Sequence, residues 1–232
     1  MITKTKAICL HTYKYSETSI IAKIFTEKIG ICSYIVKGIR SKKSKNKMAA
    51  FQPLSLLDLE VSHHPKRDLQ FIKDIKIEVP TIQIINSIEK RFVSVFISEV
   101  LLKVLIKDDP QPTLFNFIWW KIISLEKAKK TNENYPLIFL IELSKHLGFH
   151  PSNDNNNFPY FNLKTGEFSK IYQDHTIQGS LKNHLTLLLK NKEITLSKKD
   201  RSVLLNTLIG YYRLHHYNLN NVRSHEIIQL LN

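Results

Sequence analysis

A change in hydrophobic period near Pro80 constrains the fold of this chain more than any other feature. Before Pro80, apolar and polar residues alternate with period two, which is typical of half-buried β-strands. After Pro80, apolar residues recur about every 3.6 positions, which is typical of amphipathic helices. Strands followed by helices, without alternation between them, predict an α+β protein built from two modules.

Five short runs before residue 80 are rich in β-branched and aromatic residues. They cover residues 3–10, 19–25, 29–36, 54–61 and 75–79. An open sheet of five strands would expose two unpaired edges, so a small closed barrel is expected. An oligonucleotide-binding (OB) barrel and an SH3-like barrel both fit this pattern.

The helical half begins after Pro80 and should contain six helices. We expect them at residues 85–105, 112–125, 136–147, 178–190, 198–217 and 224–231. An Asn-rich segment, 152–175, is predicted to be a loop or a small hairpin that turns at residues 164–166. The predicted domains are therefore 1–80, a nucleic-acid-binding barrel, and 81–232, a helical domain carrying this insertion.

Positive charge is concentrated in the first half of the chain. The whole sequence has a net charge of +14, and residues 1–80 hold 15 Lys and Arg against 7 Asp and Glu. Residues 37–47 contain six cations and no acid. Such a run binds a phosphate backbone by releasing counterions, without base preference. The alternative is a solvated loop in a chain whose charge reflects composition alone.

Aromatic residues in the first half could add stacking platforms for bases, and those available are Tyr13, Tyr15, Phe25, Tyr34, Phe51 and Phe71. We expect Phe25 and Tyr34 to lie in the barrel core. Tyr13, Tyr15 and Phe51 flank turns or the basic run and are better candidates for stacking.

The sequence contains little that would indicate an enzyme or a metal-binding protein. Only six glycines occur, and none forms a GxGxxG or Walker P-loop pattern. His146 and His150 are separated by Gly148, which should end the helix between them. We therefore predict no catalytic residue, no cofactor and no metal site.

Cysteine usage and hydropathy lead us to expect a soluble cytoplasmic protein. Cys9 and Cys32 lie in strand-like stretches, as buried thiols of a reducing compartment do. We find no signal peptide and no apolar segment long enough to span a membrane.

Several motifs resemble the recombination mediator RecO family. In the first half they are Thr5-Lys6-Ala7-Ile8, Tyr15-Ser16-Glu17-Thr18-Ser19, Phe25-Thr26-Glu27-Lys28-Ile29-Gly30, Tyr34-Ile35-Val36-Lys37-Gly38-Ile39-Arg40 and the segment 51–57. In the second half they are Leu147-Gly148-Phe149-His150-Pro151, the segments 161–163 and 166–168, and Tyr211-Tyr212-Arg213. The resemblance covers nearly the whole chain, and it is stronger in residues 5–57 than after residue 80.

The resemblance implies an OB-fold barrel followed by an all-α domain. It also implies binding of single- and double-stranded DNA and annealing of complementary strands, without a nucleotide cofactor. The implied partners are RecR, the C-terminal tail of single-strand-binding protein and, indirectly, the RecA recombinase, so the cytoplasmic protein would associate with the nucleoid. Some family members carry a four-cysteine zinc site after the Leu-Gly-x-x-Pro stretch, but residues 152–175 contain no cysteine.

The expected DNA contacts fall into three groups. The resemblance implies Lys37 and Arg40. Charge extends the set to Lys42, Lys43, Lys45 and Lys47, and predicted turns between strands add Lys14, Lys66 and Arg67. Two other functions remain open, an OB-fold RNA-binding protein and a non-catalytic protein-interaction module.

Overall fold

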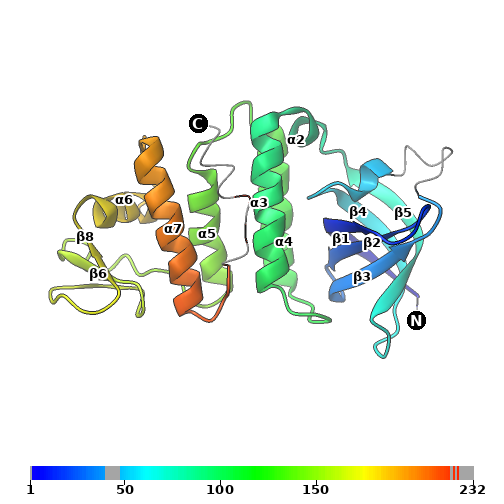
Figure 1. Ribbon diagram of the computed structural model, residues 1–232, viewed down its shortest axis with the longest axis horizontal. Coiled ribbons are helices and arrows are strands. Elements are labelled where there is room, and N and C mark those ends of the chain that lie inside the picture. The colour runs from blue at the N-terminus through cyan, green and yellow to red at the C-terminus, as the bar shows by residue number, and fades with distance from the viewer. Residues whose placement is uncertain (1, 40–47, 220–221, 223, 225–232) are drawn as a thin grey trace. The chain divides into compact units, whose positions relative to one another are not determined.

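The computed structural model describes residues 2–39, 48–219, 222 and 224 and divides into two compact units. The first unit covers Met1–Lys130 and the second Thr131–Asn232. Each unit has its own core, and Figure 1 shows the elements of each.

The first unit contains a closed five-stranded barrel, which confirms the predicted OB-fold. Its strands are β1 (Ile2–Lys14), β2 (Ile20–Thr26), β3 (Gly30–Val36), β4 (Leu56–Ser62) and β5 (Leu69–Val79). They are arranged in the order β1-β2-β3-β5-β4, and β4 pairs with β1 to close the ring. All neighbours are antiparallel except β3 and β5. Closure gives every strand two partners and so removes the exposed edges.

An irregularity in β1 bends this long strand around the barrel. Residues 2–8 of β1 pair with β4, and residues 7–14 pair with β2. The register shifts between Cys9 and His11, as at a β-bulge. Ala7 and Cys9 face the barrel core, whereas His11 after the shift is exposed.

Among the described residues of the first unit, a 3-10 helix (Ala49–Phe51) precedes β4 and three α-helices follow the barrel. The α-helices are α2 (Ile82–Asn86), α3 (Ile88–Val104) and α4 (Pro112–Lys127). The Ser87 hydroxyl accepts a hydrogen bond from the Lys90 backbone N–H and caps α3. Phe115 of α4 packs on Phe25 of β2 with ring centroids 5.4 Å apart. β5 ends at Val79, but this packing extends the first compact unit to Lys130. The division at residues 80 and 81 stays a proposal about independently folding domains.

The connection between α3 and α4 docks on the start of β3. Ile31 and Lys107 form a parallel β-bridge, and the Asp108 N–H donates to the Ile31 carbonyl at 3.3 Å. A Cβ on Gly30 would collide with the backbone of Asp109, and Gly30 has φ of +86°. Only glycine fits a position with both a positive φ and such a close backbone approach.

The second unit is helical, with a small sheet in the segment predicted as an insertion. Its helices are α5 (Tyr135–His146), α6 (Gly179–Leu189) and α7 (Lys198–Leu214). The strands β6 (Tyr160–Asn162), β7 (Glu167–Ser169) and β8 (Thr176–Gln178) form a sheet in the order β7-β6-β8. The predicted hairpin is therefore present, together with a third strand. Strands of three residues are too short to show a period in the sequence.

Aromatic side chains fill the core of the second unit. The Tyr212 hydroxyl on α7 donates to the Leu140 carbonyl of α5 at 2.7 Å, and Tyr212 is fully buried. The predicted helix at 224–231 lies outside the described residues apart from Ser224. Within the described part of the chain, no helix combines the length and apolar character needed to cross a membrane.

Candidate nucleic-acid interface

An apolar and aromatic row crosses the outer face of the barrel. Strand register places Tyr13 of β1 beside Ile21 of β2, Ile21 beside Ile35 of β3, and Ile35 beside Phe71 of β5. Their neighbours Ala22, Tyr34 and Gln70 are buried, so the row points away from the core. Tyr13 is 49% exposed and Phe71 is 36% exposed. Exposed rings on a sheet are the platforms on which OB-folds stack bases.

A second outward row runs beside the first and is more polar. His11 of β1 pairs with Lys23 of β2, and Lys23 pairs with Ser33 of β3. The His11 and Tyr13 rings meet edge to face with centroids 4.5 Å apart. Lys23 thus places a cation in the middle of the barrel face, next to the aromatic row.

A groove of about 310 Å³ opens where β3 and β5 stop pairing. Their parallel pairing covers only Ser33–Ile35 with Leu69–Phe71. The groove is lined by residues 35–37, 39 and 71–75, so it begins at the Ile35–Phe71 end of the aromatic row. Lys37 and Lys73 supply its cations and Asp74 its one acid. A concave surface with both apolar side chains and lysines in its walls suits a base and its phosphate.

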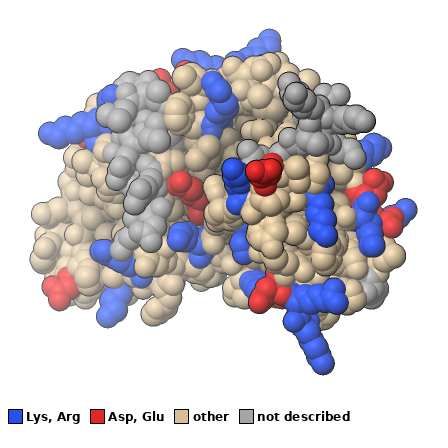
Figure 2. Space-filling model, turned by 45° about the vertical axis from the view of Figure 1, so that its right-hand side comes forward, with Lys and Arg blue, Asp and Glu red and all other residues tan. Residues whose placement is uncertain are grey.

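Two predicted contacts, Lys14 and Lys37, lie at the same end of the barrel. Lys14 pairs with Ile20, Ile20 pairs with Val36, and Lys37 follows Val36. Two strand spacings separate the two positions, or about 10 Å. Both side chains are exposed. On the face shown in Figure 2, basic side chains are spread over the surface and acidic side chains are fewer.

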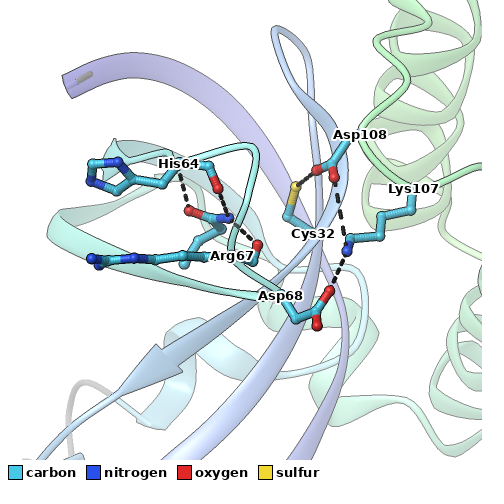
Figure 3. Close-up of polar contacts among 7 residues, drawn as sticks. Cys32, His64, Arg67, Asp68, Lys107 and Asp108 are labelled. Carbon is cyan, nitrogen blue, oxygen red and sulfur yellow. Dashed lines mark hydrogen bonds and ion pairs between the residues drawn. The ribbon is translucent and has the colours of Figure 1, made fainter.

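The other two described contacts, Lys66 and Arg67, lie at the opposite end of the barrel face, in the turn between β4 and β5. Both are exposed. Buried Gln70 holds this turn: its side-chain oxygen accepts from the His64 N–H at 2.8 Å, and its amide donates to the carbonyls of His64 and Arg67 at 2.9 and 2.7 Å (Figure 3). The turn therefore presents its cations from a backbone that is fixed in advance, which lowers the entropy cost of binding.

An ion pair joins the end of the same turn to the connection between α3 and α4. Lys107 donates to the Asp68 carboxylate at 2.6 Å (Figure 3). The hydrogen bond and charge of Lys107 lower the pKa of Asp68, and Asp68 in turn raises the pKa of Lys107. Both groups therefore stay charged near neutral pH.

The remaining predicted cations, Arg40, Lys42, Lys43, Lys45 and Lys47, lie outside the described residues. The last described residue before them is Ile39, which is 2% exposed and belongs to the barrel core cluster. The chain thus enters the basic run from an anchored position beside the groove.

The structure sorts the predicted aromatics and adds residues that the sequence analysis missed. Tyr34 is in the barrel core, as predicted, whereas Phe25 is buried against Phe115 of α4. Tyr13 and Tyr15 are exposed. The prediction for Phe51 was wrong, because it is 2% exposed and packs in the barrel core. Lys23, Lys73 and Gln70 were missed, and Phe71 was counted among the available aromatic residues but not singled out. Of these, Phe71, Lys73 and Gln70 lie on β5, whose first six residues the alternation did not reveal.

Comparison with known proteins places these features in a family context. Residues 1–80 match the family model described as "Recombination protein O N terminal". The curated "DNA repair protein RecO" of Flavobacterium psychrophilum is 35% identical over 236 residues, which cover 97% of each chain. Those of Azobacteroides pseudotrichonymphae and Flavobacterium johnsoniae are 31% and 34% identical, covering 98% and 91% of each chain. The similarity therefore spans both compact units.

Proposed function

Because the chain belongs to the RecO family of DNA repair and recombination proteins, we propose that it binds single- and double-stranded DNA and anneals complementary strands. The outward row Tyr13–Ile21–Ile35–Phe71 carries this proposal. It offers faces for unpaired bases, and cations at both ends of the same face can hold the flanking phosphates.

Annealing follows from charge neutralisation. Two strands repel each other until cations screen their phosphates. The barrel face holds one strand through stacking and through Lys14, Lys23 and Lys37. The basic run 40–47 follows Ile39 and recruits the second strand without regard to sequence. Stacking tolerates any base, so the bases of the bound strand can still be exchanged for pairing with a complement.

The partners in this proposal are RecR, the C-terminal tail of single-strand-binding protein and, indirectly, RecA. With RecR, the protein helps RecA load onto DNA coated by single-strand-binding protein. Neither binding nor annealing requires a nucleotide cofactor or a catalytic residue. The test is the time that RecA needs to assemble on coated DNA, which should shorten only when this protein and RecR are both present.

Strand annealing measured against salt tests the DNA proposal. A variant with Lys42, Lys43, Lys45 and Lys47 all changed to Ala should show a smaller salt slope, by roughly one unit for each phosphate that the protein no longer neutralises. A matched control removes four lysines of the second unit, Lys164, Lys170, Lys190 and Lys192, which lowers the net charge equally. If both variants keep the wild-type slope and rate, the basic run makes no phosphate contacts.

The same assay on RNA separates the rival functions. A DNA-repair annealer should act on DNA oligonucleotides at physiological salt, whereas an RNA-binding barrel should prefer RNA. A protein-interaction module with incidental charge should bind both weakly and without saturation.

A further inference from the structure

We propose that Cys32, His63 and Asp108 form a binding site for a divalent transition-metal ion, with Zn²⁺ as the best-matched ion. Each residue offers one ligand atom, and the three atoms lie within 4.8 Å of one another. The site is separate from the aromatic row, and it opposes our sequence-based expectation of no metal. The spacing in the chain gave no sign of it, because the three residues are distant in sequence.

Three different segments of the first unit bring these residues together. Cys32 is on β3, His63 opens the turn between β4 and β5, and Asp108 is in the connection between α3 and α4. The β-bridge from Ile31 to Lys107 fixes that connection beside β3. Asp108 adopts φ of +53°, a left-handed backbone that directs its carboxylate to the Cys32 sulfur (Figure 3). Cys32 and Asp108 are thus held side by side by contacts that do not depend on an ion.

The donor chemistry fits zinc. Cysteine sulfur, histidine nitrogen and aspartate oxygen are the three protein ligands that Zn²⁺ uses. A thiolate and a carboxylate together balance the charge of a divalent ion, so the complex is neutral in a half-buried position. On binding, the Cys32 thiol gives its proton to solvent, and the sulfur forms the bond to the metal. Water completes the four-coordinate shell.

The observed distances require small adjustments. The Cys32 Sγ donates to Asp108 Oδ1 at 2.8 Å. Tetrahedral zinc with bonds of about 2.0–2.3 Å separates its ligand atoms by roughly 3.3–3.8 Å. The thiol and the carboxylate must therefore move apart by less than about 1 Å, and the widest pair must close by about the same amount.

The neighbouring cation does not block the site. Lys107 Nζ lies 4.0 Å from the second oxygen of Asp108, but it is 2.6 Å from Asp68. Lys107 therefore pairs mainly with Asp68, and Asp108 Oδ1 remains directed toward the Cys32 sulfur. The phenol of Tyr34 also faces Cys32, and it is neutral at physiological pH because burial raises its pKa.

A bound ion would join the turn that carries Lys66 and Arg67 to β3 and to the connection between α3 and α4. Because the ion binds the folded arrangement of these residues, its binding free energy would add to the folding free energy of the first unit. This stabilisation does not depend on DNA binding, so the metal proposal and the proposed function can fail separately.

The test uses the full-length protein stripped of metal with a chelator and titrated with Co²⁺, then with Zn²⁺. Coordination by Cys32 predicts a thiolate-to-cobalt charge-transfer band that saturates at one ion per chain and is displaced by Zn²⁺. Cys32→Ser should abolish the band, and His63→Ala and Asp108→Asn should each weaken binding by more than about 100-fold, since even indirect partners of a metal contribute 10–100-fold.

Two matched controls accompany these variants. Cys9→Ala removes the other cysteine and His64→Ala the neighbouring histidine, and both should keep the band. Circular dichroism shows whether each variant is folded, and wild-type spectra alone decide whether sulfur binds the ion. Absence of the band in folded wild-type protein, or a band that survives Cys32→Ser, would overturn the proposal and leave the cluster as a hydrogen-bonded contact.

Discussion

The barrel and the helical unit both contain many aromatic residues but use them in opposite ways. In the barrel, Tyr13 and Phe71 point outward from the sheet and are half exposed. In the helical unit, Tyr211 and Tyr212 are buried, and their hydroxyls donate to the carbonyls of Phe149 and Leu140. Aromatic content alone thus says little about binding. Strand register and helical face decide whether a ring is a platform or part of the core.

The largest effect we expect comes from substituting a buried aromatic residue of the helical unit, Tyr212. Tyr212→Ala should lower the free energy of unfolding by about 3–5 kcal/mol, because it empties a buried ring site. Tyr212→Phe should lower it by only about 1–3 kcal/mol, since it leaves the Leu140 carbonyl without its hydroxyl donor. Chemical denaturation measures both. Equal losses in the two variants would show that the ring itself contributes little.

The next largest effect is a pH dependence of the barrel's stability that is due to buried Cys9. Burial raises the pKa of the Cys9 thiol from 9.0 to about 12. A raised folded-state pKa gives stability that is complete below pH 9 and is lost as the pH rises toward 12, by up to about 4 kcal/mol. Denaturation curves at pH 8 to 11 should show a decline for wild type, and Cys9→Ala should make it less steep. Part of the decline should remain, because burial also raises the pKa of Cys32 and of Tyr34. An identical slope in the variant would exclude Cys9 as the cause.

The exposed rings should affect binding and leave stability nearly unchanged. Phe71→Ala and Tyr13→Ala should each weaken binding of single-stranded DNA by about 1–3 kcal/mol if the ring stacks on a base. That corresponds to about 5- to 150-fold in Kd. Trp120→Ala is the control, because Trp120 is 65% exposed on α4 and outside the barrel row. If only the Trp120→Ala control loses affinity, DNA binds at a surface other than the row Tyr13–Ile21–Ile35–Phe71.

The smallest effect concerns single lysines at the edge of the row. Lys14→Ala or Lys23→Ala should each reduce the salt slope of DNA binding by about one unit, with a similar change for every DNA sequence. Lys145→Ala, at the end of α5, is a suitable control because the residue is exposed and lies in the other unit. A change that depends on sequence would mean that the lysine contacts a base.

Much of the fold was predictable because the period of the sequence directly reflects burial. The five strands and most of the described helices follow from it, although α2 and α3 were expected as one helix over 85–105. The hairpin strands are too short to show a period, and its prediction rested on the turn residues 164–166. The binding face was only partly predictable, since the shift at Cys9 and His11 in β1 reverses which side chains face out. Strict alternation from Cys9 would point Tyr13 into the core. Likewise, Lys73 and Asp74 interrupt the apolar pattern of β5, so Phe71 did not stand out.

The residues near Gly30 show a second limit of sequence reasoning. Contacts between β3 and residues 107–109 join segments more than 70 positions apart. No sequence pattern in either segment predicts that it contacts the other. The cluster of Cys32, His63 and Asp108 depends on the same contacts. Tertiary docking, and not local propensity, brings these groups together.

The docking of residues 107–109 on β3 also bears on how the protein is made. The β-bridge from Ile31 to Lys107 and the close approach of Gly30 to Asp109 cannot form until that connection has left the ribosome. Long-range pairing of this kind is slow to form. During synthesis, β1, β2 and β3 can form local hairpins early, but the contact between the start of β3 and residues 107–109 must wait for more than 70 further residues. Chaperone dependence should therefore be greatest in nascent chains that stop between the end of β5 and the start of α4.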